Sequence, residues 1–511
     1  MTATIRETHR ALTVSAIALA SGVLFYSSTA RAQVIAVKTL PIADGEQFSF
    51  FPSANLGMGG VSIAIRDRIH DLFVNPAKGG ADGAAGRLGR SYFFGAPTFF
   101  SVSPRAGGGS TFPAGVVARS GSSFAAAAVA IQTVKDGRRF NPAVFSFDLN
   151  GRGASATDDS HTNRYGFVML GRTFGASKLS IGASALWSAL GAIDGVNLLY
   201  TQSRSVSQSG GSADLRLGLL KEWNGGHSLE AMVLQRRVSM SNDVTYVDLF
   251  WDAIRRQTIE RPRLEYDGER TRTSGIHLGY QRALADSAWR IGAVITANRV
   301  SQLNTPQYEI TSVPSDGGRS SAFNLGVGLA RTQGGATLAI DAIYEPIWSR
   351  MWVVADSETT TGASIRTGAT AVDNRWRFSN ALLRVGLSQD LDLESKTTTF
   401  RFQLGMQARS VYYTADQRDL VRGSTRTGGD DWMEWTRSWG FVLRRPAIEI
   451  RYGGRLTSGA GRPGVIGPDP VPPRPGPALD LPIGPGVVAP STTLNKVRVT
   501  MHQISVSLPM R

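Results

Sequence analysis

The residues of this chain that could do chemistry are few and lie far apart. Five histidines follow the first 32 residues, namely His70, His161, His227, His277 and His502. Metal sites gather their ligands at short, regular spacings, which these histidines lack. The pair Asp430-Asp431 could bind calcium in a loop, although solvated acids are far commoner. Nucleophile-elbow, zinc-protease and phosphate-loop motifs do not occur. We therefore predict no catalytic residue, no metal site and no cofactor, and we expect that the protein is not an enzyme.

The elements that position the side chains of this chain are predicted to be strands. In residues 400–407, Phe-Arg-Phe-Gln-Leu-Gly-Met-Gln, apolar and polar residues alternate, and the same pattern occurs in 276–281, 323–329 and 448–452. Successive side chains of a strand point to opposite faces, so each segment has one apolar and one polar face. An amphipathic helix would instead repeat its apolar residues at i, i+3 and i+4.

The number and spacing of these segments indicate a transmembrane barrel. We predict fourteen strands, over residues 122–134, 161–173, 177–188, 213–223, 226–240, 273–285, 287–300, 319–333, 335–345, 376–390, 396–409, 436–445, 447–456 and 494–508. A weaker pair over 88–101 and 113–119 would make sixteen. Both totals are even, as single-chain bacterial barrels require. The predicted fold is an all-β antiparallel barrel of about 14 strands, with 16 possible.

The gaps between the strands are alternately short and long. We expect long outer loops over residues 135–160, 189–212, 241–272, 301–318, 346–375, 410–435 and 457–493, the last of them rich in proline and glycine. Long loops at one rim and short turns at the other are typical of outer-membrane barrels. Trp223 and Trp289 fall at the short-turn rim, and four tryptophans at the other rim, as an aromatic girdle would require: Trp348, Trp376, Trp435 and Trp439.

The first residues are typical of a secretory signal. Arg6 and Arg10 precede the apolar stretch 11–26, and Ala30-Arg31-Ala32 fits a cleavage site. We expect residues 1–32 to be removed, so that the mature chain begins at Gln33. A membrane-anchoring helix fits less well, because the stretch is short of the 18 or more apolar residues that a span needs.

The charge of the chain is strongly positive, at +15 over 511 residues, and there are no cysteines. The basic residues are scattered singly, so we expect no binding of nucleic acid. The predicted partners are outer-membrane lipids and lipopolysaccharide, and a GC-rich genome that favours arginine is an equally good explanation of the charge. We expect a monomer in the outer membrane of a Gram-negative cell.

Residues 33–86 do not show the alternation of a barrel strand. Their glycines permit tight packing of the backbone, and Pro76 restricts Asn75 to an extended conformation. We predict a small, tightly turned unit of residues 33–86 ahead of a barrel that occupies residues 87–511.

This unit resembles the start of the FadL-type transporters of long-chain fatty acids and other hydrophobic compounds, and of the related PorV-like proteins. The residues that carry the resemblance are Gly57, Gly59, Gly60, Ala64, Asp67, Phe73, Asn75, Pro76 and Ala77. The resemblance implies a barrel that is plugged by an N-terminal hatch, with Asn75, Pro76 and Ala77 as structural parts of the hatch. One departure is the end of the chain, Pro509-Met510-Arg511, where such barrels usually have an aromatic residue.

One predicted loop, residues 241–272, contains a pattern that fits a binding element. Tyr246, Leu249, Phe250, Ala253 and Ile254 are spaced as on one face of a helix. In FadL-type proteins the third and fourth outer loops form a groove that captures the ligand. The resemblance therefore makes four residues candidates for ligand binding: Leu249, Phe250, Trp251 and Ile254. The alternative is a loop helix that packs its apolar side on the rim.

The resemblance implies transport of hydrophobic or amphipathic small molecules, such as long-chain fatty acids, into the cell. Two alternatives remain open: a PorV-like structural or secretion-associated protein, and a general diffusion porin. The lumen distinguishes them, because a pore needs a continuous polar channel, whereas a transporter of hydrophobic compounds needs a filled lumen with an apolar pocket.

Overall fold

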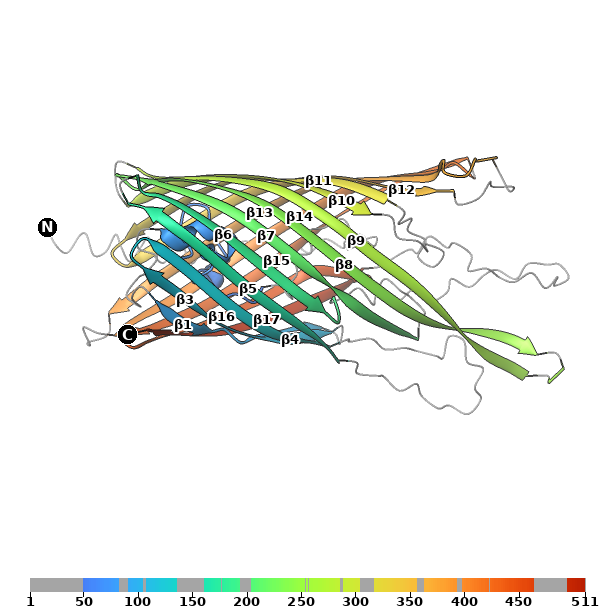
Figure 1. The fold of residues 1–511 in the computed structure, drawn as a ribbon, viewed down its shortest axis with the longest axis horizontal. Helices are drawn as coiled ribbons and strands as arrows, with labels where there is room; N and C mark the ends of the chain where they lie inside the picture. The colour runs from blue at the N-terminus through green and yellow to red at the C-terminus, as the bar shows by residue number, and fades with distance from the viewer. Residues whose placement is uncertain are drawn as a thin grey trace. The chain divides into compact units, whose positions relative to one another are not determined.

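The computed structural model is a β-barrel (Figure 1). It describes residues 49–81, 91–103, 107–135, 160–175, 177–193, 204–252, 254–255, 257–284, 288–303, 317–355, 363–392, 398–421, 423–463 and 494–510. The predicted signal, residues 1–32, lies outside these ranges, as does most of the predicted Pro-rich loop.

The described strands form one closed antiparallel ring. β1 (Tyr92–Gly95) and β2 (Thr98–Ser103) both pair with β17 (Leu494–Pro509) and with β3 (Gly108–Ser120). They are therefore two halves of one barrel strand, interrupted at Ala96-Pro97, where proline has no N–H to donate. Counted in this way, the 17 segments make a barrel of 16 strands.

The other strands follow one another around the ring in sequence order. They are β4 (Ser123–Lys135), β5 (Ser160–Phe174), β6 (Leu179–Leu190), β7 (Ser205–Trp223), β8 (His227–Asp252), β9 (Gln257–Ala283), β10 (Trp289–Leu303), β11 (Gly317–Gln333), β12 (Ala336–Val354), β13 (Thr370–Asp392), β14 (Thr399–Asp419), β15 (Ser424–Arg445) and β16 (Ile448–Pro463). Each is hydrogen-bonded to the next.

The predicted strands are confirmed, including the weaker pair, so the correct total is the larger one, 16. Their ends at the short turns agree to within a few residues. At the other rim the strands are longer than predicted, as Figure 1 shows for the hairpin of β8 and β9. Most of the predicted loops 241–272 and 410–435 is therefore strand. Beyond the bilayer a strand keeps its ladder of hydrogen bonds but no longer needs alternating lipid-facing residues.

The barrel is apolar outside and polar inside. Leu325, Val327 and Leu329 of β11 are exposed on the outer wall, as the alternation predicts. Gln403 of β14 and Asp341 of β12 are buried on the inner side. A soluble protein would show the opposite distribution, so lipid must cover the outer wall. The protein is a β-barrel of the bacterial outer membrane.

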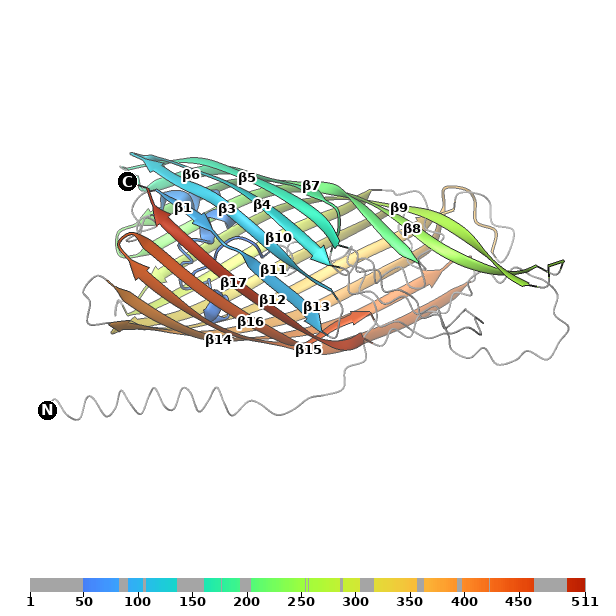
Figure 2. The same cartoon turned by 90° about the horizontal axis from the view of Figure 1, so that it is seen from below.

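Residues 49–81, here called the N-terminal segment, lie inside the ring of strands near its short-turn rim (Figure 2). They contain three short helical turns, η4 (Leu56–Met58), α2 (Asp71–Val74) and η5 (Pro76–Gly80). No helix in the described ranges is long and apolar enough to cross a membrane. The predicted unit 33–86 extends beyond the described residues at both ends, so its limits stay a prediction.

Candidate functional site

Glycines on the inner wall allow the N-terminal segment to approach the strands closely. A Cβ added to Gly328 of β11 would lie 2.7 Å from Cβ of Ile63, and one added to Gly182 of β6 would lie 2.6 Å from the carbonyl oxygen of Pro76. The inner-wall glycines that would meet the segment in this way are Gly182, Gly218, Gly292, Gly326, Gly328, Gly386, Gly405, Gly440 and Gly453. They come from β6, β7, β10, β11 and β13 to β16, so the contact runs around much of the ring.

Three glycines of the predicted hatch motif complete this contact. A Cβ on Gly57 would lie 2.7 Å from the backbone nitrogen of Gly440 in β15. Gly59 and Gly60 have φ angles of 72° and 73°, in the left-handed region that glycine adopts without strain. The structure thus gives a physical reason for glycine at each of these positions.

Polar side chains of the inner wall bind the backbone of the N-terminal segment. The carboxylate of Asp341 accepts a hydrogen bond from the backbone N–H of Ser62 at 2.7 Å. The amide of Gln403 donates to the carbonyl oxygen of Ala54 at 2.8 Å. Such bonds satisfy the backbone groups of irregular structure inside a barrel.

Asp67 ties together two parts of the N-terminal segment. Its carboxylate accepts hydrogen bonds from Oγ of Ser53 at 2.5 Å and from the backbone N–H groups of Ala54 at 2.9 Å and His70 at 3.0 Å. Burial acts to raise the pKa of Asp67, but His70 and these hydrogen bonds outweigh burial, so the pKa lies below its ordinary value. Asp67 is therefore ionised, and its carboxylate holds these two parts of the segment together.

The Asn-Pro-Ala motif anchors the N-terminal segment to β8. Oδ1 of Asn75 accepts the backbone N–H of Ala77 at 3.1 Å, and its Nδ2 donates to Glu230 at 3.1 Å. Nζ of Lys78 lies 3.0 Å from the same carboxylate and 3.4 Å from that of Asp71. A chain of charges thus joins the motif to the barrel wall.

Asp71 is the acid of this chain of charges whose pKa lies near neutral pH. Burial raises the pKa of Asp71 to about 7, against the opposing effect of Lys78. Burial alone would lower the pKa of Lys78, but Asp71 and Glu230 raise it above its ordinary value, so the lysine stays charged. The charge of this anchor therefore changes at Asp71 rather than at Lys78.

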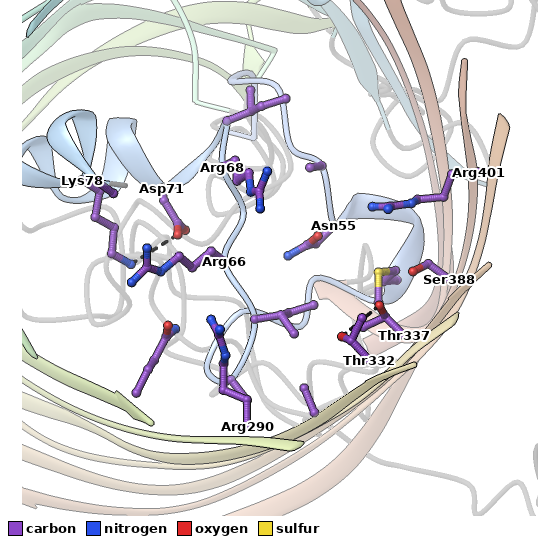
Figure 3. Close-up of a pocket in the computed structure, with 18 of the residues that line it drawn as sticks. Asn55, Arg66, Arg68, Asp71, Lys78, Arg290, Thr332, Thr337, Ser388 and Arg401 are labelled. Carbon is purple, nitrogen blue, oxygen red and sulfur yellow. Dashed lines mark hydrogen bonds and ion pairs between the residues drawn. The ribbon is translucent and has the colours of Figure 1, made fainter. Parts of the chain in front are cut away.

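A cavity of about 740 Å³ lies beside the N-terminal segment at the short-turn end of the strands (Figure 3). Four acidic residues line it, Asp71, Glu230, Asp390 and Glu449. Seven basic residues also line it, Arg66, Arg68, Lys78, Arg290, Arg401, Arg444 and Arg451. The excess of positive charge makes the cavity suited to an anion.

Several of these basic groups are paired. Nε of Arg401 lies 2.5 Å from Asp390, and Arg66 lies 2.6 Å from Glu222 of β7. Arg68 and Arg290 have no acidic partner within 4.0 Å in the described part of the chain, and Figure 3 shows both pointing into the cavity. Burial and nearby arginines lower the pKa of Arg68. An anion between Arg68 and Arg290 would relieve this repulsion.

The inner wall becomes apolar further toward the long-loop rim. Ile347 of β12, Phe378 of β13 and Val411 and Tyr413 of β14 form one buried cluster. A second cluster joins Phe50 of the N-terminal segment to side chains of five strands, β4 to β8: Ala130, Tyr165, Leu190, Val206, Val238, Met240 and Val244. The lumen therefore has apolar patches on the long-loop side of the segment and the charged cavity on its short-turn side. A third apolar cluster, which includes Phe73, Phe124 and Phe167, packs the segment itself against the wall.

The predicted helix at residues 246–254 is wrong. Leu249, Phe250 and Trp251 belong to β8 and pair with Glu260, Ile259 and Thr258 of β9. The backbone of these three residues is therefore strand rather than helix. Ile254 lies in the turn between the strands, with a relative exposure of 96%. Ligand binding by these four residues stays a prediction.

The acidic pair Asp430-Asp431 does not lie in a loop either. Both residues belong to β15 and pair with Tyr413 and Tyr412 of β14. In the described ranges, no three His, Cys, Asp or Glu side chains are placed to hold a metal ion.

Sequence reasoning missed the inner-wall glycines and the arginines of the cavity. Gly328 and Gly405 belong to the polar faces of the alternating segments 323–329 and 400–407. Glycine recurring on the polar face of several strands is a signal that a backbone approaches that face. The arginines gave no such signal, because they come from five distant parts of the chain.

Comparisons with known proteins give distant likenesses. No protein-family model matches the sequence, and no curated protein does so either. Among solved structures, the chain is similar to a Pseudomonas aeruginosa FadL homologue, at 13% identity and a TM-score of 0.43, over 90% of this chain and 99% of that one. A bacterial polysaccharide outer membrane secretin matches at 7% identity and a TM-score of 0.38, over 82% of this chain and 98% of that one. The ferric-catecholate import receptor Fiu from E. coli K12 matches at 6% identity and a TM-score of 0.35, over 81% of each chain.

Proposed function

We propose that this protein transports amphipathic small molecules with an anionic head group, such as long-chain fatty acids, inward across the outer membrane. The observation that carries the proposal is the division of the lumen. Apolar walls that include Phe378 and Val238 lie on the long-loop side of the N-terminal segment, and the arginine-rich cavity lies on its short-turn side. An apolar chain fits the walls, and an anionic head group fits the cavity.

The proposed mechanism begins at the long-loop rim, where the turn around Ile254 makes the first contact with the ligand. The ligand then moves along the apolar walls. The N-terminal segment acts as a hatch, and it exchanges its hydrogen bonds with the inner wall for water when it moves. Arg68 and Arg290 receive the head group in the cavity. A general diffusion pore fits less well, because the segment occupies the lumen where an open channel would run.

Uptake of labelled oleate tests the proposal. Cells that produce the protein should take up oleate faster than cells that lack it, and equal rates would contradict the proposal. The double variant Arg68→Gln/Arg290→Gln should lower oleate uptake several-fold but leave uptake of oleyl alcohol, which has no charge, unchanged. The matched control is Arg172→Gln/Arg282→Gln, which removes two exposed arginines from the outer wall. A similar loss in the control would show that charge at the cavity is not the cause.

A further inference from the structure

A row of arginines crosses the outer wall of the barrel from β8 to β13. The strand register places the following residues side by side: Arg237, Arg272, Ser301, Arg319, Arg350 and Arg375. The five arginines are exposed and point outward, on the same face as the apolar band. We call these five the arginine row.

Three ladder pairs in this row place two arginines directly opposite one another. Arg237 pairs with Arg272, Arg319 with Arg350, and Arg350 with Arg375. Partners in an antiparallel ladder have Cα atoms about 4.5–5.5 Å apart, and like charges at that spacing destabilise a sheet. This repeated pairing concentrates positive charge on the outer wall, so an anion bound there from outside the chain would relieve the repulsion.

One carboxylate orders the centre of the row without neutralising it. Asp373 accepts hydrogen bonds from Nε of Arg350 at 2.8 Å and from a terminal guanidinium nitrogen of Arg375 at 3.0 Å. Both arginines stay largely exposed, at 51% and 44% of their side-chain surface. For Arg319, the described residues provide no acidic partner within 4.0 Å. Two guanidinium groups are thus held in place beside a third by one carboxylate. Asp416 of β14, the ladder partner of Arg375, brings a second negative charge to the end of the row, so positive charge stays in excess.

The row lies at the long-loop edge of the lipid-facing band. On β12 the exposed Trp348 is the outward residue immediately before Arg350. On β11, which runs in the opposite direction, Ser321 and then Phe323 are the outward residues that follow Arg319 toward the band. Tryptophan at such an edge is typical of the level of lipid head groups. A molecule that meets the row from the membrane would therefore place its apolar part on the band below and its polar part on the arginines.

We propose that the outer wall of β11 to β13 binds an outer-leaflet glycolipid that carries at least two phosphate groups, the chemistry of the lipid A part of lipopolysaccharide. Guanidinium groups bind phosphate through paired hydrogen bonds, which suits Arg319, Arg350 and Arg375 better than lysines would. The acyl chains lie against the apolar band. This inference is independent of the transported ligand.

The test measures binding to the purified full-length protein in detergent by native mass spectrometry. The probes are diphosphoryl lipid A, the same lipid without its phosphates, and inorganic pyrophosphate. The variant is Arg319→Gln/Arg350→Gln/Arg375→Gln. The matched control, Arg172→Gln/Arg282→Gln/Arg331→Gln, removes three exposed arginines near the short-turn rim. Because the triple variant leaves Asp373 without its two partners, Arg319→Gln is measured alone as well.

We expect the triple variant to bind diphosphoryl lipid A at least about ten-fold more weakly, a loss of about 1.4 kcal/mol, and Arg319→Gln to show a smaller loss in the same direction. The control should bind as the unaltered protein does. Equal binding of the lipid without phosphates would overturn the proposal, as would equal losses in variant and control. Pyrophosphate that binds as tightly as the lipid would also overturn the proposal, because the site would then recognise phosphate without the lipid. Should the triple variant not fold, unchanged binding by Arg319→Gln overturns the proposal.

Discussion

At the scale of single residues, the inner-wall glycines decide whether the N-terminal segment can pack. Their role is steric rather than conformational, since Gly405 and Gly386 lie in regular strands. The alternation of a barrel strand does not require glycine, so their presence reports the close approach of another backbone.

We expect Gly405→Ala to loosen the N-terminal segment by about 1–3 kcal/mol, because the new Cβ would overlap Met58 and Gly59. Hydrogen exchange of the amides of residues 55–61 should speed up while the strands stay protected. Gly175→Ala is the matched control, because no atom lies within 4 Å of its added Cβ. Unchanged exchange in Gly405→Ala would show that the segment does not rest on this strand.

The raised pKa of Asp71 predicts how the stability of the packed N-terminal segment depends on pH. The pKa of Asp71 is raised to about 7 in the folded protein, from an ordinary value of 3.8. Protonated Asp71 is therefore favoured by folding, so its contribution is complete below about pH 4 and is lost as the pH rises through about 7. Amide exchange of α2 and η5, corrected for its intrinsic pH dependence, should quicken between pH 5 and 8.

The substitution Asp71→Asn should remove this pH dependence and leave the segment as well protected at pH 8 as at pH 5. Asp67 serves as the internal comparison. Its pKa is lowered, so its contribution is present at neutral pH and is lost as the pH falls below about 4. An unchanged profile in Asp71→Asn would assign the titration to another group.

At the scale of elements, the lengths of the strands were less predictable than their positions. Alternation located fourteen barrel strands and, more weakly, the pair that completes the sixteen, because lipid selects apolar residues at every second position. Alternation did not locate the strand ends beyond the long-loop edge of the membrane, where β8 continues to Asp252 and β9 begins at Gln257. The same failure turned a strand hairpin into a supposed loop helix around Leu249.

The protruding part of β8 and β9 should be dispensable for folding but not for capture of the ligand. Residues 247–262 can be replaced by Asn-Gly, which suits a two-residue hairpin, because Tyr246 and Arg263 are ladder partners. We expect a folded barrel with several-fold lower uptake of oleate. The control shortens the β14–β15 hairpin by replacing 418–425 in the same way, between the partners Gln417 and Arg426. Equal uptake by the two shortened proteins would show that Ile254 and its neighbours take no part in capture of the ligand.

At the scale of the whole molecule, the N-terminal segment and the barrel are joined by polar contacts around much of the ring. The proposed transport requires these contacts to break, because the segment separates the apolar walls from the arginine-rich cavity. A transporter and a permanently plugged barrel differ in this motion alone.

A disulfide between the segment and the wall tests the motion. The chain has no cysteine of its own, and the backbone nitrogen of Ser62 lies 2.7 Å from the carboxylate of Asp341. We expect the oxidised Ser62→Cys/Asp341→Cys protein to take up almost no oleate, and reduction to restore uptake. Each single variant controls for the loss of the side chain. Normal uptake by the oxidised protein would mean that the segment need not move at this point.

The sequence by itself determined that the chain is a barrel of the outer membrane, because contact with lipid imposes a period of two that is legible residue by residue. It also marked the glycines and the Asn-Pro-Ala motif of the N-terminal segment. The tertiary structure alone decided which side chains lie close together. It brought Asp71, Lys78 and Glu230 into one chain of charges, gathered Arg68 and Arg290 at one cavity, and set Arg319 beside Arg350. These groups are distant in sequence, and their proximity follows from strand register and ring closure, which no local pattern encodes.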